Sequence, residues 1–217
     1  MANCCTPKGY RWVFSERSAS RDARLYRRRG LDATSRRIVD FLKARGVEGQ
    51  TVLEVGGGIG AIQIELLKAG AARAVSVELT PTYEEVAKRL LDENGLAGRV
   101  DRRVMDFAQG ASQVEPADIV IMNRVLCCYP DMPRLAGAAA DHAAQTLVVT
   151  FPRRAWWDRA GLGIANGVLW ITRREFHIFV HRPADIIATS EAHGLRPVVN
   201  EAGFLWTLAA LSRGAAT

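Results

Sequence analysis

The chain has 217 residues, of which 48% are hydrophobic, and a formal net charge of +6 at pH 7. This length suits one α/β domain, alone or with a small cap, and it is long enough to bury a substantial core. No stretch has the length of a membrane span, and residues 1–10 contain no apolar signal region. We therefore expect a cytoplasmic protein with no membrane span, for which only weak contact with a membrane surface stays open.

Apolar periodicity predicts helices and strands that alternate along most of the chain. The predicted helices are Ser15–Arg29, Thr34–Arg45, Ala61–Ala69, Thr82–Asn94, Met132–Ala144 and Pro183–His193. The predicted strands are Thr51–Val55, Ala74–Glu78, Val100–Met105, Asp118–Met122, Thr146–Phe151, Arg196–Asn200 and Phe204–Leu211. This alternation is typical of an α/β fold, so we expect a Rossmann-like, mostly parallel sheet of seven strands with helices on both faces.

Two segments fall outside the regular alternation. Residues 1–46 contain a basic helix and are predicted to form an N-terminal helical lid, while residues 47–217 form the main domain. Residues 152–180 follow the fifth strand and are rich in tryptophan and other apolar side chains. An apolar insertion at this place is predicted to cap a hydrophobic pocket; dimerisation and contact with a membrane surface are the alternatives.

A glycine-rich turn joins the first strand of the main domain to the following helix. The turn contains Gly56, Gly57, Gly58 and Gly60. Glycines let the backbone turn sharply and approach a ligand closely, and the next helix presents free N–H groups at its positive end. The sequence therefore predicts a nucleotide-binding site here.

Two cofactor classes use such a turn, and the neighbouring acids help to separate them. Glu54 lies on the first strand, and Glu78 ends the second at the spacing of a ribose-binding acid. The residues Gly56-x-Gly58-x-x-Ala61 also fit the dinucleotide fingerprint, so an NAD-dependent oxidoreductase is the alternative. A carboxylate at Glu54 would repel a pyrophosphate, whereas it suits the ammonium and sulfonium groups of S-adenosylmethionine.

The segment from Glu54 to Gly60 follows the order acid-x-Gly-x-Gly-x-Gly. It resembles the first motif of the class I S-adenosylmethionine-dependent methyltransferases. The resemblance implies S-adenosyl-L-methionine as cofactor, S-adenosyl-L-homocysteine as product, and a sheet whose last strand is antiparallel.

The same resemblance implies further cofactor contacts. In that family an acid after the third strand holds the adenine amino group, and Asp106 stands there, with Phe107 placed to stack on the adenine. A capping aspartate beside a core phenylalanine is an equally open interpretation. Leu79 is expected against the adenine or the sheet, while Asn123 and Arg124 follow the fourth strand, near the methionine end of the cofactor.

The segment after the fourth strand is expected to face the transferable methyl group, because ligands lie beyond the carboxyl ends of parallel strands. It lacks the Asn/Asp-Pro-Pro-aromatic motif of many nucleic-acid methyltransferases, and this absence disfavours a nucleobase as the methyl acceptor. Its residues Arg-Val-Leu-Cys-Cys-Tyr-Pro-Asp, together with His181, are similar to the small-molecule group around the magnesium-protoporphyrin O-methyltransferases. The side chains expected to contact the acceptor are Cys127, Cys128, Trp156 and Trp157.

Candidates for a general base are Tyr26, Tyr129, His142 and His181, with Asp131 as a further carboxylate. An ordinary buried tyrosine and an exposed histidine are the alternatives for Tyr26 and His142. No metal is expected, because the sequence has no CxxC spacing.

The cysteines form two adjacent pairs, Cys4-Cys5 and Cys127-Cys128. Small apolar packing, with the first pair on a loose terminus, is the favoured interpretation. A thiol-bound metalloid or a thiol-linked substrate is the alternative, because thiolates favour soft ions.

The arginine-rich helix from Ser15 to Arg29 has three interpretations: nucleic-acid contact, recognition of a carboxylate or phosphate, and a solvated lid. We favour the lid and expect no nucleic-acid partner, with an RNA-associated protein as the alternative. The sequence thus predicts a methyltransferase for a small, partly apolar molecule, acting as a monomer or homodimer.

Overall fold

The computed structural model describes residues 10, 13–153, 167, 178–179 and 181–214. Trp156, Trp157, Cys4, Cys5 and most of the predicted insertion lie outside the described residues. Predictions made for these positions therefore stay predictions.

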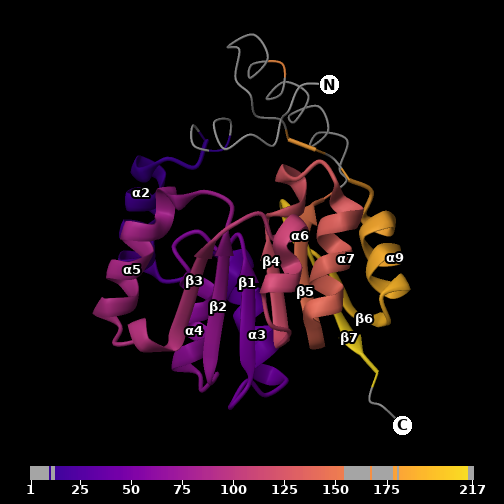
Figure 1. The fold of residues 1–217 in the computed structure, drawn as a ribbon, viewed down its shortest axis with the longest axis horizontal. Coiled ribbons are helices and arrows are strands. Elements are labelled where there is room, and N and C mark those ends of the chain that lie inside the picture. The colour runs from indigo at the N-terminus through magenta and orange to yellow at the C-terminus, as the bar shows by residue number, and fades with distance from the viewer. Residues whose placement is uncertain (1–9, 11–12, 154–166, 168–177, 180, 215–217) are drawn as a thin grey trace.

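The core of the protein is one seven-stranded sheet in the order β3-β2-β1-β4-β5-β7-β6 (Figure 1). The strands are β1 Thr51–Val55, β2 Arg73–Glu78, β3 Val100–Val104, β4 Ala117–Asn123, β5 Ala143–Pro152, β6 Leu195–Ala202 and β7 Trp206–Arg213. β7 is antiparallel to both of its neighbours, and the other strand pairs are parallel. The predicted mostly parallel, Rossmann-like sheet is confirmed.

Helices cover both faces of the sheet (Figure 1). The α-helices are α2 Glu16–Arg29, α3 Ala33–Ala44, α4 Ala61–Lys68, α5 Glu84–Glu93, α6 Phe107–Gly110, α7 Met132–His142 and α9 Pro183–Ala192. The short 3₁₀ turns are η1 Pro81–Tyr83, η2 Ala97–Arg99, η3 Ala111–Gln113 and η4 Leu126–Cys128. Among the described residues, the helices α2 to α5 share one apolar core with the sheet, and α6, α7 and α9 share the other.

Alternate residues of the central strands supply these two cores. On β1, Leu53 and Val55 belong to the core of α6, α7 and α9, whereas Val52 belongs to that of α2–α5. All three are buried, since successive side chains of a strand point to opposite faces. A central strand covered on both faces therefore reads as an apolar run.

Most predicted boundaries lie within two residues of the observed ones, and the larger differences are the following. The helix α6 was not expected, because a four-residue helix is too short to show a helical period. The predicted helix Thr82–Asn94 is divided into η1 and α5, and β5 begins at Ala143, three residues before the predicted Thr146. Within the part of the chain that the structure describes, no helix is long and apolar enough to cross a membrane.

Asp118 joins three parts of the sheet at the amino end of β4. Its Oδ2 accepts hydrogen bonds from the Thr51 backbone N–H (2.8 Å) and hydroxyl (2.7 Å), and its Oδ1 accepts one from Gln145 (2.8 Å). Partial burial acts to raise the pKa of this carboxyl, but the hydrogen bonds from Thr51 and Gln145 outweigh it and lower the pKa. The charged form is therefore stabilised by folding.

We expect Asp118→Ala to lower the free energy of unfolding by about 1 kcal/mol, because the partly buried Thr51 donors lose a charged acceptor. The loss should be measured by urea unfolding, with the exposed Asp92→Ala as a matched control. Because the folded-state pKa is lowered, the wild-type advantage is present above the ordinary aspartate pKa of about 3.9 and shrinks as the pH falls below it. Equal stability of the two variants at pH 7 would contradict this role.

Candidate functional site

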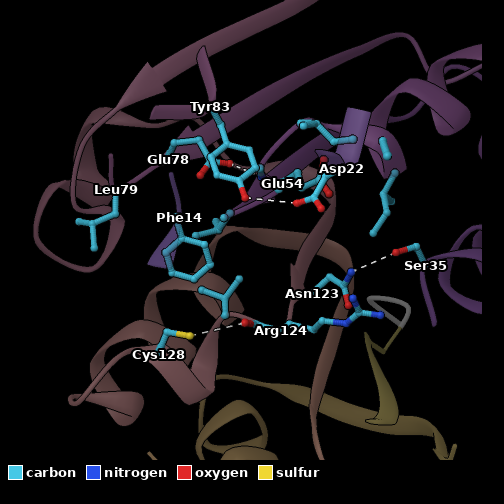
Figure 2. A pocket seen from close by; sticks show the side chains of 18 of the residues that line it. Phe14, Asp22, Ser35, Glu54, Glu78, Leu79, Tyr83, Asn123, Arg124 and Cys128 are labelled. Carbon is cyan, nitrogen blue, oxygen red and sulfur yellow. Dashed lines mark hydrogen bonds between the residues drawn. The ribbon is translucent and has the colours of Figure 1, made fainter. Parts of the chain in front are cut away.

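A cavity of about 730 Å³ opens beyond the carboxyl ends of the central strands, with the glycine turn in its wall (Figure 2). The predicted site residues that line it are Tyr26, Glu54, Gly56, Gly57, Gly58, Glu78, Leu79, Asp106, Phe107, Asn123, Arg124, Cys128 and Tyr129. Of the predicted site residues that the structure describes, four others do not line it: Gly60, Cys127, His142 and His181.

The glycine turn has no room for side chains on its inner side. A Cβ atom at Gly57 would lie 2.4 Å from Cδ of Glu54, and one at Gly56 would lie 2.7 Å from Cγ2 of Val125. Gly56 also has a φ of 69°, in the left-handed region that favours glycine. Gly60, the N-cap residue of α4, also lies in the left-handed region, with a φ of 75°. The turn is thus packed between the carboxylate below it and the segment after β4.

Glu54 and Glu78 are buried acids in the wall of this cavity, with exposed fractions of 1% and 8%. Oε1 of Glu78 accepts a hydrogen bond from the Gly58 backbone N–H at 2.6 Å, and Oε2 of Glu54 accepts a longer one from Gln63 at 3.4 Å. Burial raises the pKa of Glu54 to about 7 and that of Glu78 to about 8. A cationic or hydroxyl-bearing ligand would stabilise their charged forms.

Arg102 supports the turn and was missed by the sequence analysis. Its guanidinium donates to Glu84 (2.8 Å), to the Ser76 hydroxyl (3.1 Å) and to the Gly58 carbonyl (3.1 Å), with only 3% of the side chain exposed. It is also the leading influence that opposes the raised pKa of Glu78. Arg102 and Arg103 are adjacent in the sequence, and only the packing distinguishes the buried one from the exposed one.

Asp106 and Phe107 combine parts of both interpretations given to them. Asp106 occupies the cap position of α6, but its side chain makes no capping hydrogen bond. Instead both of its carboxylate oxygens accept from the Tyr129 hydroxyl at 3.1 Å. Phe107 is a core residue, 3% exposed, that also lines the cavity and packs edge-on against His142.

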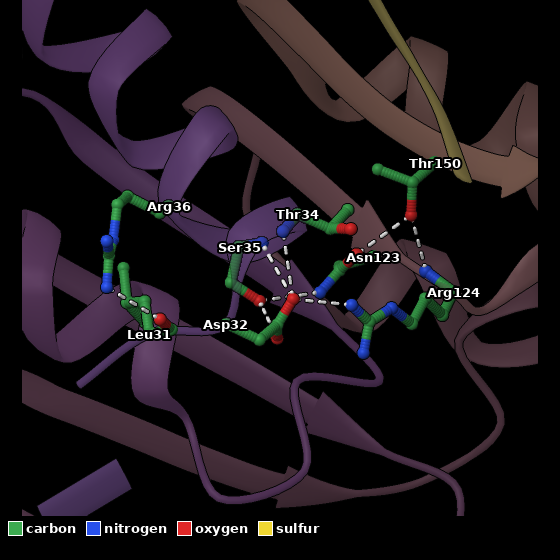
Figure 3. A network of polar contacts seen from close by, with 8 residues as sticks. All are labelled: Leu31, Asp32, Thr34, Ser35, Arg36, Asn123, Arg124 and Thr150. Atoms are coloured by element: carbon green, nitrogen blue, oxygen red, sulfur yellow. Dashed lines mark hydrogen bonds and ion pairs between the residues drawn. The ribbon is translucent and has the colours of Figure 1, made fainter. Parts of the chain in front are cut away.

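A polar network joins the start of α3 to the ends of β4 and β5 (Figure 3). The Asp32 carboxylate caps α3 and accepts from Arg124 at 2.6 Å. Asn123 donates to the Ser35 hydroxyl at 3.2 Å and accepts from the Thr150 hydroxyl at 2.8 Å. Arg124 has a φ of 63°, unusual for a residue with a side chain, and such backbone conformations occur often at functional sites.

The two tyrosines predicted as bases both donate their hydroxyl to a carboxylate. The Tyr26 hydroxyl lies 2.5 Å from Oε1 of Glu65, and the Tyr129 hydroxyl is bonded to Asp106. Burial and the neighbouring Glu65 raise the pKa of Tyr26 far above its ordinary value. A phenol in this state is a poor base near neutral pH.

The other three candidate bases do not line the cavity and have structural partners. Both ring nitrogens of His142 lie against backbone carbonyls, at 2.7 Å from that of Ala138 and 2.9 Å from that of Ala111. Nε2 of His181 lies 2.9 Å from the Tyr129 carbonyl, and Asp131 caps α7. Among the residues that the structure describes, no group of three His, Cys, Asp or Glu side chains is placed to hold a metal ion.

Side chains near the N-terminus also line the cavity, although the sequence analysis did not predict them as site residues. They include Tyr10, Phe14, Asp22 and Leu25. The Tyr10 hydroxyl donates to the Cys128 carbonyl, and the Tyr83 hydroxyl donates to Asp22 at 3.3 Å. Aromatic residues that far from the glycine turn in sequence carry no pattern that would place them at the site.

The fold is shared with solved methyltransferase structures. Magnesium protoporphyrin IX methyltransferase from Synechocystis, solved with bound SAH, superimposes with a TM-score of 0.69 at 20% identity, covering 83% of this chain and 82% of that one. An O-methyltransferase family protein from Burkholderia thailandensis gives a TM-score of 0.66 at 19% identity, covering 85% and 57%. The class I methyltransferase fold predicted from the glycine motif is thereby confirmed.

The sequence comparison defines the family. A family model described as a methyltransferase domain matches residues 23–204, so the chain belongs to this methyltransferase family. A ribosomal protein L11 methyltransferase from Thermotoga maritima is 41% identical over 95 residues, which are 43% of this chain and 34% of that protein. The chain spans about a third of the length of the first curated relatives that it matches.

We expect Gly57→Ala to weaken S-adenosylhomocysteine binding by about tenfold, because overpacking a filled site costs roughly 1–3 kcal/mol. The new methyl group would displace the Glu54 carboxylate, whose Cδ lies 2.4 Å from the Cβ position. Isothermal titration measures the change, and Gly98→Ala is the matched control, since its Cβ meets no atom within 4 Å. Unchanged affinity in a folded Gly57→Ala protein would refute the packing argument.

The raised pKa of Glu78, about 8, predicts a pH-dependent stability difference between the free protein and Glu78→Gln. The stability that the folded protein gains from protonated Glu78 is fully present below the ordinary glutamate pKa of about 4.3. This stability is lost as the pH rises towards 8. The amide stays neutral, so Glu78→Gln should gain at least about 2 °C in melting temperature over wild type between pH 5 and 8.5. A difference that does not change with pH would show that Glu78 is charged throughout.

Proposed function

We propose that this protein transfers the methyl group of S-adenosyl-L-methionine to a small, partly apolar molecule in the cytoplasm. The observation that carries the proposal is the pair of buried acids, Glu54 and Glu78, beside a glycine turn in a cavity of about 730 Å³. Family membership and the SAH-bound neighbour support the same activity.

The residues of the cavity fit the chemical groups of this cofactor. Glu78 would accept hydrogen bonds from the ribose hydroxyls, and Asp106 would accept one from the adenine amino group. Glu54 and Asn123 stand where the cationic methionine end would lie. When bound, the cofactor supplies an electrophilic methyl group on its sulfonium.

The contribution of the protein is then mainly alignment. Proximity and orientation alone can supply a large part of the lowering of the activation barrier in such two-substrate reactions. Each of the four candidate bases, Tyr26, Tyr129, His142 and His181, is engaged in a structural hydrogen bond. This favours an acceptor that reacts without a base, such as a carboxylate or a thiolate.

The cavity wall supports a small acceptor. Apolar and aromatic side chains from the N-terminal region and from the segment after β4 lie on it, among them Phe14, Leu25 and Val125. We assign residues 1–46 to a lid and residues 152–180 to a cap. A cavity covered in this way suits a small molecule better than the protein substrate of the ribosomal protein L11 methyltransferases.

Isothermal titration with S-adenosylhomocysteine, with NADH in parallel, tests the proposal. We expect S-adenosylhomocysteine to bind and NADH not to bind, and Glu78→Ala to weaken the former by at least about tenfold, since a hydrogen bond to a charged group contributes roughly 1.5–3 kcal/mol. Glu54→Ala should also weaken binding, because the cationic end of the ligand loses its carboxylate.

Glu85→Gln is the matched control for these variants, because 85% of the Glu85 side chain is exposed, away from the cavity wall. Preference for NADH would instead assign the glycine turn to a dinucleotide and overturn the methyltransferase proposal.

A further inference from the structure

Two adjacent thiols lie in η4, the turn that follows β4 at the edge of the cavity. Sγ of Cys127 lies 3.7 Å from Sγ of Cys128. The Cys128 side chain lines the cavity, while that of Cys127 is buried behind it. Figure 2 shows the Cys128 thiol turned towards the Arg124 carbonyl, and Cys127 lies near the same oxygen at 3.6 Å. The two sulfur atoms therefore point to one place.

The backbone that carries these thiols is held from two directions. The carbonyl of Cys127 accepts from the Phe179 backbone N–H at 2.8 Å, and the carbonyl of Cys128 accepts from the Tyr10 hydroxyl. The next carbonyl, that of Tyr129, lies 2.9 Å from Nε2 of His181. Three consecutive carbonyls with three partners fix the turn, so the thiol pair is organised before any ligand binds.

The pair meets the requirements of a dithiol ligand site. Both cysteines are free, and the hydrogen bond between them lowers the pKa of Cys127, so that one member ionises more readily. Thiolates favour soft, thiophilic centres. No third metal-ligating side chain completes the site among the residues that the structure describes. A fitting ligand must therefore need only two sulfur atoms from the protein.

We propose that Cys127 and Cys128 form a binding site for monosubstituted trivalent arsenicals, of the form R–As(OH)₂. Such a compound brings its third substituent with it and binds two neighbouring thiols on one side of the arsenic. Each thiol proton leaves with one hydroxide as water. Two As–S bonds replace two As–O bonds, and no electron is transferred.

Other soft ions fit this geometry less well. A linear two-coordinate ion needs its two sulfur ligands on opposite sides, whereas these sulfur atoms are only 3.7 Å apart on adjacent residues. Zinc takes four protein ligands in structural sites, and three protein ligands plus a water molecule in catalytic sites. A pyramidal arsenic with its own organic substituent requires neither arrangement.

The substituent of the bound arsenical would extend into the cavity. Phe14 and Val125 line the same cavity as Cys128, so an aromatic substituent would meet apolar side chains. The site thus borders the proposed acceptor region, but the capture of an arsenical requires neither a cofactor nor methyl transfer.

The test uses phenylarsine oxide and the full chain in a Cys4→Ser/Cys5→Ser background, which removes the other adjacent pair. Native mass spectrometry should show one arsenical per chain, retained in excess glutathione and released by 2,3-dimercaptopropanol. A second As–S bond formed within one molecule raises affinity by about 100-fold or more. Cys127→Ser and Cys128→Ser should therefore each lose retention by about that factor.

Three controls make the outcome decisive. Circular dichroism on the same preparations shows whether each variant is folded, and S-adenosylhomocysteine titration keeps a failure of the proposed function separate from a failure of this site. Weaker capture in 6 M urea is expected, because the preformed turn is lost. Retention by either single variant, or equal capture in urea, would overturn the site.

Discussion

The contact between a buried carboxylate and a glycine is the constraint on which the site depends. Glu54 lies at the end of β1, where the sheet is covered on both faces, and its side chain occupies the space that a Cβ of Gly57 would need. Burying a charged acid costs free energy unless hydrogen bonds or a ligand compensate for the lost water. For Glu54 the hydrogen-bond donor, the backbone N–H of Gln63, lies 3.4 Å away. The turn, the acid and the cavity therefore form one unit: the glycines make room for the carboxylate, and the carboxylate fixes the electrostatic character of the cavity floor.

The parts of this unit that are close in sequence could be predicted from it. The apolar run of β1, the glycines and the acid at the end of β2 occur at spacings that the fold requires, and the structure brings Glu54, Glu78 and Gly58 to the same wall. The mostly parallel sheet followed from the alternation of elements. Strand and helix types were predictable because the central strands are buried on both faces and helices such as α3, α5 and α7 have one apolar face.

Features that depend on distant contacts were not predictable in this way. Arg102 looks like any arginine of an edge strand, and only the packing shows that it holds the carbonyl of Gly58. The placement of Tyr10 against the Cys128 carbonyl joins residues 118 positions apart. For His142 and His181, residue type and position suggested acid–base chemistry. In the structure, a ring nitrogen of each lies within hydrogen-bond distance of a backbone carbonyl. A histidine can form structural hydrogen bonds as well as act as a base, and sequence alone does not distinguish the two roles.

The three consecutive carbonyls at the end of η4, those of Cys127, Cys128 and Tyr129, connect two distant parts of the chain. One of their partners comes from the start of the chain, at Tyr10, and two come from the segment that precedes α9, at Phe179 and His181. Two segments that share one anchor are thermodynamically linked, because loosening η4 weakens the contacts of both at once. A substitution in either segment that disturbs η4 would then weaken the contact of the other segment with this turn.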